Sequence, residues 1–196
     1  MAHVEDVKLP DIGDFADVEV IEFGYRYLEE LGVRDVEVQL NSIGDGSDRA
    51  DYRLELTSFL ESRKDDLSED AARRLYENPM RVLDSKADAS VVADAPVPLD
   101  HIGSSARSHF EEVRTGLEQL GIPHVVAPRL VRGLDYYNRT TFEFAAPGLD
   151  AAQNAVGGGG RYDGLVRRFQ GQEVPAVGAS VGVDRLLVAL RHLGLV

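Results

Sequence analysis

The sequence predicts an α+β protein in which helices flank a mostly antiparallel sheet and a helical subdomain is inserted between the strands. Three observations support this fold class. Residues 16–31 place apolar side chains every three or four positions, as a helix does, and residues 36–41 alternate apolar with polar side chains, as a strand does. Residues 48–120 have a mostly helical pattern. After residue 123 the pattern becomes strand-like again.

The first core segment, residues 1–47, is predicted to hold that helix and that strand. The helix should bury one apolar face and end at Gly32, because glycine readily takes the backbone conformation that closes a helix. Its apolar face comprises Val18, Ile21, Tyr25, Leu28 and Leu31. A turn-forming stretch at 42–47 then ends the strand.

Residues 48–120 are predicted to form a helical insertion subdomain, a lobe separate from the sheet. A helix is expected at about 48–62, and a second one capped by Ser68 should end near Asn78 because a proline follows. A third helix is expected from about Ser104 to Leu120, with Gly121 as its stop.

The second core segment, residues 121–196, is predicted to return to the sheet. A short strand is expected at 124–127, and 130–137 and 140–144 are predicted to be two neighbouring antiparallel strands joined through residues 138 and 139. A further strand at 176–182 should lie in the same sheet and precede a short helix at 184–193.

Charge divides the chain into two halves. The formal net charge is −13; residues 1–100 hold 25 acids and 11 bases, whereas residues 101–196 hold 9 acids and 10 bases, all of them arginine. The acidic half predicts a solvated surface that repels nucleic acid. Arginine without lysine favours bidentate recognition of carboxylate or phosphate, although a codon bias toward arginine would give the same composition.

Composition also excludes several classes of protein. The absence of cysteine excludes disulfides, thiolate metal sites and a cysteine nucleophile. The sequence shows neither a signal peptide nor an 18-residue apolar stretch, so we expect a soluble, cytoplasmic protein without membrane contact. No metal-ligating motif stands out.

Three segments carry candidate functional residues, and each has a plainer interpretation. Arg132 stands among apolar residues of a predicted strand, where a buried guanidinium needs an anionic partner, but it could equally face solvent. The glycine run 157–160 lets a ligand approach the backbone closely, or it is a flexible turn. Arg185 opposes the dipole in the first turn of a predicted helix, which suits a bound polyanion, or it is an ordinary surface arginine.

The order and wording of these segments resemble a known family. LVRGLDYYNRTTFEF, GGGGRYDGLV and PAVGASVGVDRLL are similar to the two histidine-specific motifs and the third class-defining motif of bacterial histidyl-tRNA synthetases, which are class II aminoacyl-tRNA synthetases. The similarity extends upstream through VEVQLNSIGD and NPMRVLDSK. It therefore covers nearly the whole chain from about Asp17.

The resemblance implies roles for particular residues. Arg132 is expected to contact the histidine carboxylate and the ATP α-phosphate as the catalytic arginine, and Arg185 to hold the ATP γ-phosphate. The expected histidine pocket is formed by Tyr136, Tyr137, Tyr162, Gly158 and Gly159, together with Arg132. ATP with Mg²⁺ would be a substrate, no tightly bound cofactor is expected, and the further partners are histidine, tRNA-His and, in the full-length family, a second copy in a homodimer.

The same resemblance implies that this chain is the C-terminal part of a catalytic domain. We expect it to lack the first two class-defining motifs and the anticodon-binding domain, and Asp184 stands where many relatives carry glutamate. Three functions follow as hypotheses: histidine–tRNA ligase as a partial chain with little activity alone, a histidine-sensing regulatory paralogue of ATP phosphoribosyltransferase, or an inert fragment. The intact arginine and tyrosine motifs favour the first.

Overall fold

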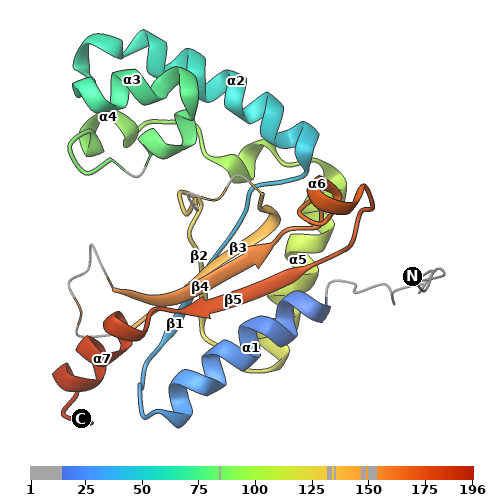
Figure 1. Ribbon diagram of the computed structural model, residues 1–196, viewed down its shortest axis with the longest axis vertical. Helices are drawn as coiled ribbons and strands as arrows, with labels where there is room; N and C mark the ends of the chain where they lie inside the picture. Colours follow the sequence, from blue (N-terminus) through green and yellow to red (C-terminus); the bar gives the residue numbers. More distant parts are fainter. Residues whose placement is uncertain (1–14, 84, 132–133, 135, 147–148, 150–153) are drawn as a thin grey trace.

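A five-stranded sheet organises the structure (Figure 1). The computed structural model describes residues 15–83, 85–131, 134, 136–146, 149 and 154–196. The strands are β1 (Glu37–Ser42), β2 (His124–Val126), β3 (Asn138–Ala145), β4 (Ala155–Arg161) and β5 (Val177–Val181), in the order β2-β1-β3-β4-β5. β1 and β2 pair in parallel, and the other neighbours pair antiparallel. The prediction of a mostly antiparallel α+β fold is thus confirmed.

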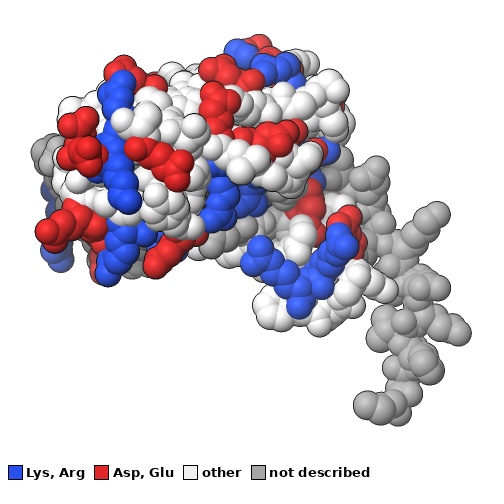
Figure 2. Space-filling model, turned by 90° about the horizontal axis from the view of Figure 1, so that it is seen from above, with Lys and Arg blue, Asp and Glu red and all other residues white. Residues whose placement is uncertain are grey.

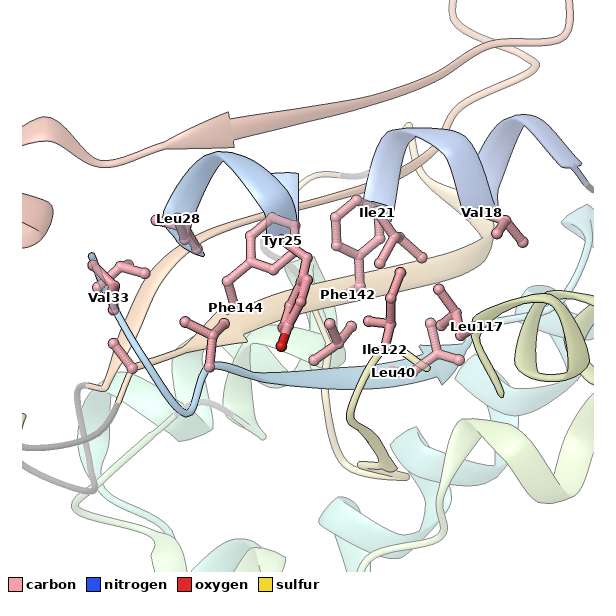
Figure 3. Close-up of a cluster of buried hydrophobic side chains, with 14 of the residues drawn as sticks. Val18, Ile21, Tyr25, Leu28, Val33, Leu40, Leu117, Ile122, Phe142 and Phe144 are labelled. Atoms are coloured by element: carbon pink, nitrogen blue, oxygen red, sulfur yellow. The ribbon is translucent and has the colours of Figure 1, made fainter. Parts of the chain in front are cut away.

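Helices α1 (Phe15–Glu30) and α5 (Ser104–Gln119) pack side chains against one face of this sheet. Figure 3 shows the apolar side chains of α1 meeting those of β3 and of the segment around α5. The centre of this cluster consists of fully buried side chains: Ile21, Leu28, Leu40, Val113, Leu117, Phe142 and Phe144. Gly32 and Gly121, at φ +86° and +66°, end α1 and α5 where the sequence predicts.

A second apolar cluster lies among the helices α2 (Gly46–Ser62), α3 (Glu69–Glu77) and α4 (Ala89–Val92). We call residues 46–95 the insertion lobe, and Figure 1 shows its helices above the sheet. Its buried side chains are Tyr52, Leu56, Leu60, Ala71, Leu75, Val82, Val92 and Ala95. Seen from above, acidic and basic side chains are interspersed on the molecular surface (Figure 2).

Helix α5 packs in a different apolar cluster from the other helices of the predicted insertion. Side chains of α5 belong to the first cluster, which joins α1 and α5 to the sheet, whereas those of α2 to α4 belong to the second. Short 3-10 turns connect these elements, at η1 (Lys64–Asp66), η2 (Pro79–Val82) and η3 (Pro98–His101). The division of the chain into domains at residues 47 and 120 stays a prediction. The buried side chains of α5 pack with those of the sheet.

The strand predicted at 130–137 is wrong for all of its described residues. The chain turns at its start, where Leu130 N donates to Ala127 O at 2.8 Å and Pro128 occupies the second position of the turn. It turns again before β3, with Tyr137 N bonded to Leu134 O. The neighbours of β3 are β1 and β4, so the described residues of 130–137 do not form the predicted pairing with β3.

The C-terminal part follows the prediction more closely. The glycine run is an exception: it is not the flexible turn that was one interpretation of the sequence but lies inside β4, which pairs with β3 on one side and β5 on the other. β5 is the expected strand of the same sheet, and α7 (Val183–His192) follows it after the single turn α6 (Arg167–Gln170) between β4 and β5. Among the described residues, no helix is long and apolar enough to cross a membrane.

Candidate functional site

Three tyrosines meet where β3 begins and β4 ends. The Tyr136 and Tyr137 rings lie edge to face with centroids 5.0 Å apart, and the Tyr162 ring lies 5.9 Å from the first and 6.1 Å from the second. Contacts of this kind between aromatic rings stabilise the folded chain by more than the burial of the rings alone. The sheet register brings these residues together, because Asn138 of β3 pairs with Arg161 of β4.

Tyr136 and Tyr137 line a cavity of about 480 Å³. This volume lies in the range of small-molecule sites. The remaining lining consists of polar, charged and glycine residues from the start of α2, the start of β3 and the segment between β4 and β5 that includes α6: Asp45, Gly46, Arg49, Asn138, Arg139, Asp163, Gly164, Arg168 and Glu173. An aromatic wall opposite charged groups suits a small ligand with a planar ring and charges of both signs.

Both tyrosines reach this cavity because the segment before β3 turns. In a strand, consecutive side chains would point to opposite faces, so only one tyrosine could line the site. Tyr136 lies in a turn and Tyr137 directly after it, and this geometry removes the alternation.

The glycine run contributes to the sheet on both faces. A Cβ on Gly160 would lie 3.2 Å from Cδ2 of Tyr137, whereas a Cβ on Gly159 would lie 2.7 Å from Cζ of the core residue Phe142. Because side chains alternate along a strand, Gly158 shares the tyrosine face with Gly160. The two glycines predicted to line the pocket, Gly158 and Gly159, therefore lie on opposite faces of β4.

A buried ion pair anchors the end of β4. Arg161 donates from Nε and Nη2 to Oδ2 of Asp17 on α1, at 3.0 and 2.5 Å, with the two side chains 5% and 0% exposed. Burial raises the pKa of Asp17, but hydrogen bonds from His109 and Arg161 and the arginine charge outweigh it, so the net pKa is lowered. Nε2 of His109 lies 3.5 Å from Asp17 Oδ1 and 3.0 Å from Thr140 Oγ1.

A second set of bonds ties the loop after β4 to the start of β3. Asn138 Nδ2 donates to Asp163 Oδ2 at 2.9 Å, and Asp163 N donates back to Asn138 Oδ1 at 2.9 Å. The other carboxylate oxygen of Asp163 accepts from Arg161 Nη1 and from Ala176 N. Since Tyr137 and Tyr162 flank these residues, the bonds fix the two aromatic segments relative to each other.

Arg139 closes the charged side of the cavity. Its guanidinium donates from Nε and Nη2 to the two carboxylate oxygens of Asp45, at 2.8 and 3.2 Å, and from Nη2 to Ser105 Oγ at 3.1 Å. Its backbone has φ +50°, which is uncommon for a residue other than glycine. The register between β3 and β4 is irregular at this point.

The structure does not bring all predicted site residues together. Arg132 lies outside the described residues. Arg185 is exposed on α7 and lines a different hollow of about 280 Å³ with Leu149, Asp184 and Val188. Gly182, just before α7, bonds to Val156 at the start of β4, whereas Tyr162 follows its end. At about 3.3 Å per residue, the six residue steps from Val156 to Tyr162 span roughly 20 Å.

Sequence reasoning missed several polar residues of this region. Asp17, Arg49, His109 and Arg139 come from α1, α2, α5 and β3, and no local pattern connects them. Arg161 and Asp163 stand beside Tyr162 in the motif, which was the one available signal. Within the part of the chain that the structure describes, no group of three or more His, Cys, Asp or Glu side chains could hold a metal ion.

The sheet, its flanking helices and the helical insertion together give the fold of class II aminoacyl-tRNA synthetases. The sequence model of the histidyl-tRNA synthetase family matches residues 13–186. The chain therefore belongs to the histidyl-tRNA synthetase family.

Individual relatives agree with this assignment. The chain is 46% identical over 181 residues to a histidine–tRNA ligase from Picosynechococcus sp. (strain ATCC 27264 / PCC 7002 / PR-6), covering 91% of this chain and 42% of that protein. The structure of apo S. aureus histidyl-tRNA synthetase matches with a TM-score of 0.74 and 32% identity, over 94% of this chain and 45% of that one. The histidyl-tRNA synthetase from Nostoc sp. PCC 7120, at 20% identity and a TM-score of 0.60, shares the fold. The chain thus spans less than half the length of each of these three relatives.

Proposed function

We propose that this chain supplies the histidine pocket and part of the ATP site of a histidine–tRNA ligase. In this reaction ATP activates histidine to histidyl-adenylate, and the histidyl group is then transferred to tRNA-His. The observation that carries the proposal is the cavity walled by Tyr136 and Tyr137, with Tyr162 packed against both rings. The three tyrosines belong to the motifs that resemble the family's histidine-specific ones.

The tyrosine wall is proposed to receive the imidazole ring of histidine. Aromatic rings bind a planar ring through their faces and edges, and tyrosine hydroxyls add hydrogen bonds that distinguish imidazole from apolar rings. Gly158, on the tyrosine face of β4, leaves room for the ligand beside the sheet. Gly159 belongs to the opposite face and is assigned a packing role instead.

The arginines are proposed to stabilise the phosphate charge. The histidine carboxylate attacks the α-phosphorus of ATP, a phosphorus–oxygen bond forms, and pyrophosphate leaves with the electrons of the broken bond. Negative charge accumulates on the phosphate oxygens, so fixed cations lower the barrier. Arg132 is assigned to the α-phosphate and the histidine carboxylate, and Arg185 to the γ-phosphate. Mg²⁺ enters as part of the ATP substrate.

The wider setting is proposed from the family. The complete protein would act in the cytoplasm as a homodimer and use tRNA-His as its second substrate.

The test is histidine-dependent ATP–pyrophosphate exchange by the full-length protein that contains this chain. We expect exchange with histidine and at least a tenfold higher KM for histidine in a Tyr162→Ala variant. Tyr76→Ala is the matched control, because Tyr76 is an exposed tyrosine of α3. Histidine binding without any exchange would instead favour the histidine-sensing regulatory function. Absence of both binding and exchange would overturn the proposal.

The 196 residues alone are expected to exchange pyrophosphate at least about 10²-fold more slowly than the full-length protein. Each missing electrostatic donor typically costs about 10²–10³ in rate, and the family's second arginine-bearing ATP motif is not recognisable in this sequence. Equal rates for the two proteins would contradict this expectation.

A further inference from the structure

An arginine at the start of the segment 129–137 binds the insertion lobe. Nη1 of Arg129 donates to the carbonyl oxygens of Val92 and Ala95, at 2.9 and 3.1 Å, and Nη2 donates to that of Ala93. Val92 and Ala95 belong to the apolar cluster of the lobe. The planar guanidinium fork can satisfy several carbonyls at once, which a lysine could not do with the same geometry.

The end of the same segment is bound to the lobe by a second arginine. Nη1 of Arg49, on α2, donates to the carbonyl oxygen of Tyr137 at 2.6 Å. Arg49 stands three residues before Tyr52, whose ring is buried in the lobe cluster. Since both residues belong to one continuous helix, any displacement of the lobe moves the partner of the Tyr137 backbone.

Among the described residues, a side chain of the sheet also binds the start of this segment. Asn41 of β1 donates from Nδ2 to the carbonyl oxygens of Pro128 and Leu130, at 3.2 and 2.9 Å. These bonds take the place of a strand ladder. Of the two described ends of the segment, the first is thus bound to the sheet by Asn41 and to the lobe by Arg129, and the second is bound to the lobe by Arg49 and continues into β3.

We propose that Arg49 and Arg129 are positioning residues through which the insertion lobe sets the geometry of the Tyr136–Tyr137 wall. The lobe then determines how tightly the cavity holds the ring of its ligand, although the lobe cluster itself lies outside the cavity. The identity of that ligand, histidine, rests on the proposed function. The mechanical connection rests only on the hydrogen bonds described above.

The first experiment measures the connection without any ligand. Hydrogen–deuterium exchange of the 196-residue chain is compared for wild type, Arg129→Met and Arg49→Met. The control is Arg107→Met, which removes a similar arginine-to-carbonyl bond, to Leu99, outside the segment. We expect at least tenfold faster exchange in peptides covering 129–137 in the first two variants, with β3 and β4 unchanged. Hydrogen–deuterium exchange at the wild-type rate in these peptides of both Arg129→Met and Arg49→Met would overturn the proposal.

The second experiment uses pyrophosphate exchange by the full-length protein. Arg129→Met and Arg49→Met should raise KM for histidine about tenfold, with KM for ATP changed less than twofold, and Arg49→Lys should recover most of the loss at that site. A general loss of folding would not separate the two substrates in this way. Faster amide exchange with an unchanged KM for histidine would overturn the proposal. Absence of pyrophosphate exchange in the wild type would refute the proposed function. The hydrogen–deuterium exchange measurement would then decide whether Arg49 and Arg129 position the segment.

Discussion

Breaking the buried pair Asp17–Arg161 should destabilise the chain far more than breaking an ion pair at its surface. Asp17 is fully buried and accepts two hydrogen bonds from Arg161, whose side chain is 5% exposed. Removing one member leaves the other charge in a poorly solvated place, which typically costs about 3–5 kcal/mol. The variants Asp17→Ala and Arg161→Met should each lose unfolding free energy within that range, but by different amounts.

The difference follows from the partners that remain. In Asp17→Ala, Arg161 still donates to Asp163 at 3.1 Å, and Asp163 is 27% exposed, so the expected loss is near the lower limit, about 3 kcal/mol. In Arg161→Met, the buried Asp17 retains contact with His109 and the expected loss is nearer 5 kcal/mol. The double variant Asp17→Ala/Arg161→Met should lose less than the two single losses together, since no buried charge of the pair remains.

Urea unfolding, followed by circular dichroism, measures these free energies. The matched control is Asp70→Ala, which breaks ion pairs with Arg73 and Arg74 on exposed α3 and should cost less than about 1 kcal/mol. A loss below 1 kcal/mol in both Asp17→Ala and Arg161→Met would show that the pair contributes nothing beyond a surface contact and would refute the reasoning.

The same pair predicts how stability depends on pH. Burial acts to raise the pKa of Asp17, but the hydrogen bonds of His109 and Arg161 lower it below the ordinary value of 3.8. A lowered pKa in the folded state means that the unfolded chain binds the proton more readily. The contribution of Asp17 is therefore complete above about pH 4 and is lost as the pH falls through the folded-state pKa. Unfolding free energies of wild type and Asp17→Ala should converge as the pH falls below 4, and a constant difference would contradict this.

Two further predictions concern backbone packing and helix capping. Gly159→Ala should cost about 1–3 kcal/mol in urea unfolding, because its Cβ would lie 2.0 Å from the Gly178 carbonyl oxygen, while Gly164→Ala, with open space around it, should be nearly neutral. Equal effects of the two would contradict the close packing of β4 on β5. Ser68→Ala should cost about 1 kcal/mol, since the Ser68 hydroxyl accepts from Ala71 N as the cap of α3, and Ser58→Ala, on α2, is the control. A neutral Ser68→Ala would show that the cap does not stabilise the chain.

Local sequence patterns predicted most of the elements. The helices α1, α2, α3 and α5 lie within two residues of their predicted bounds, and Ser68 is the predicted cap of α3. Periodicity succeeds there because each helix buries a continuous apolar stripe, which leaves a clear spacing in the sequence. The strand β5 was predicted to lie in the same sheet, and it does so by pairing with β4.

The segment 130–137 shows where local patterns fail. Its apolar and β-branched residues favour a strand, yet side chains distant in sequence take the backbone groups that a strand would use. Asn41 binds the carbonyl oxygens of Pro128 and Leu130, and Arg49 binds that of Tyr137. These partners precede the segment by 87 to 89 residues, so no local window contains them. An even larger separation, 144 residues, explains why Asp17 was not predicted as the partner of Arg161.

The glycine run shows how one pattern can carry fold and function together. β4 pairs with a neighbour on each side, so the backbone amides of its glycines take part in the sheet and are not free to cradle a phosphate, as those of a glycine-rich phosphate loop do. The glycine amides of β4 are therefore not the groups that would bind a phosphate near this sheet. The ten basic residues of 101–196 are all arginine, the side chain best shaped for that task. Arginine without lysine in this half is thus consistent with the proposed phosphate contacts of Arg132 and Arg185, and codon bias would give the same composition.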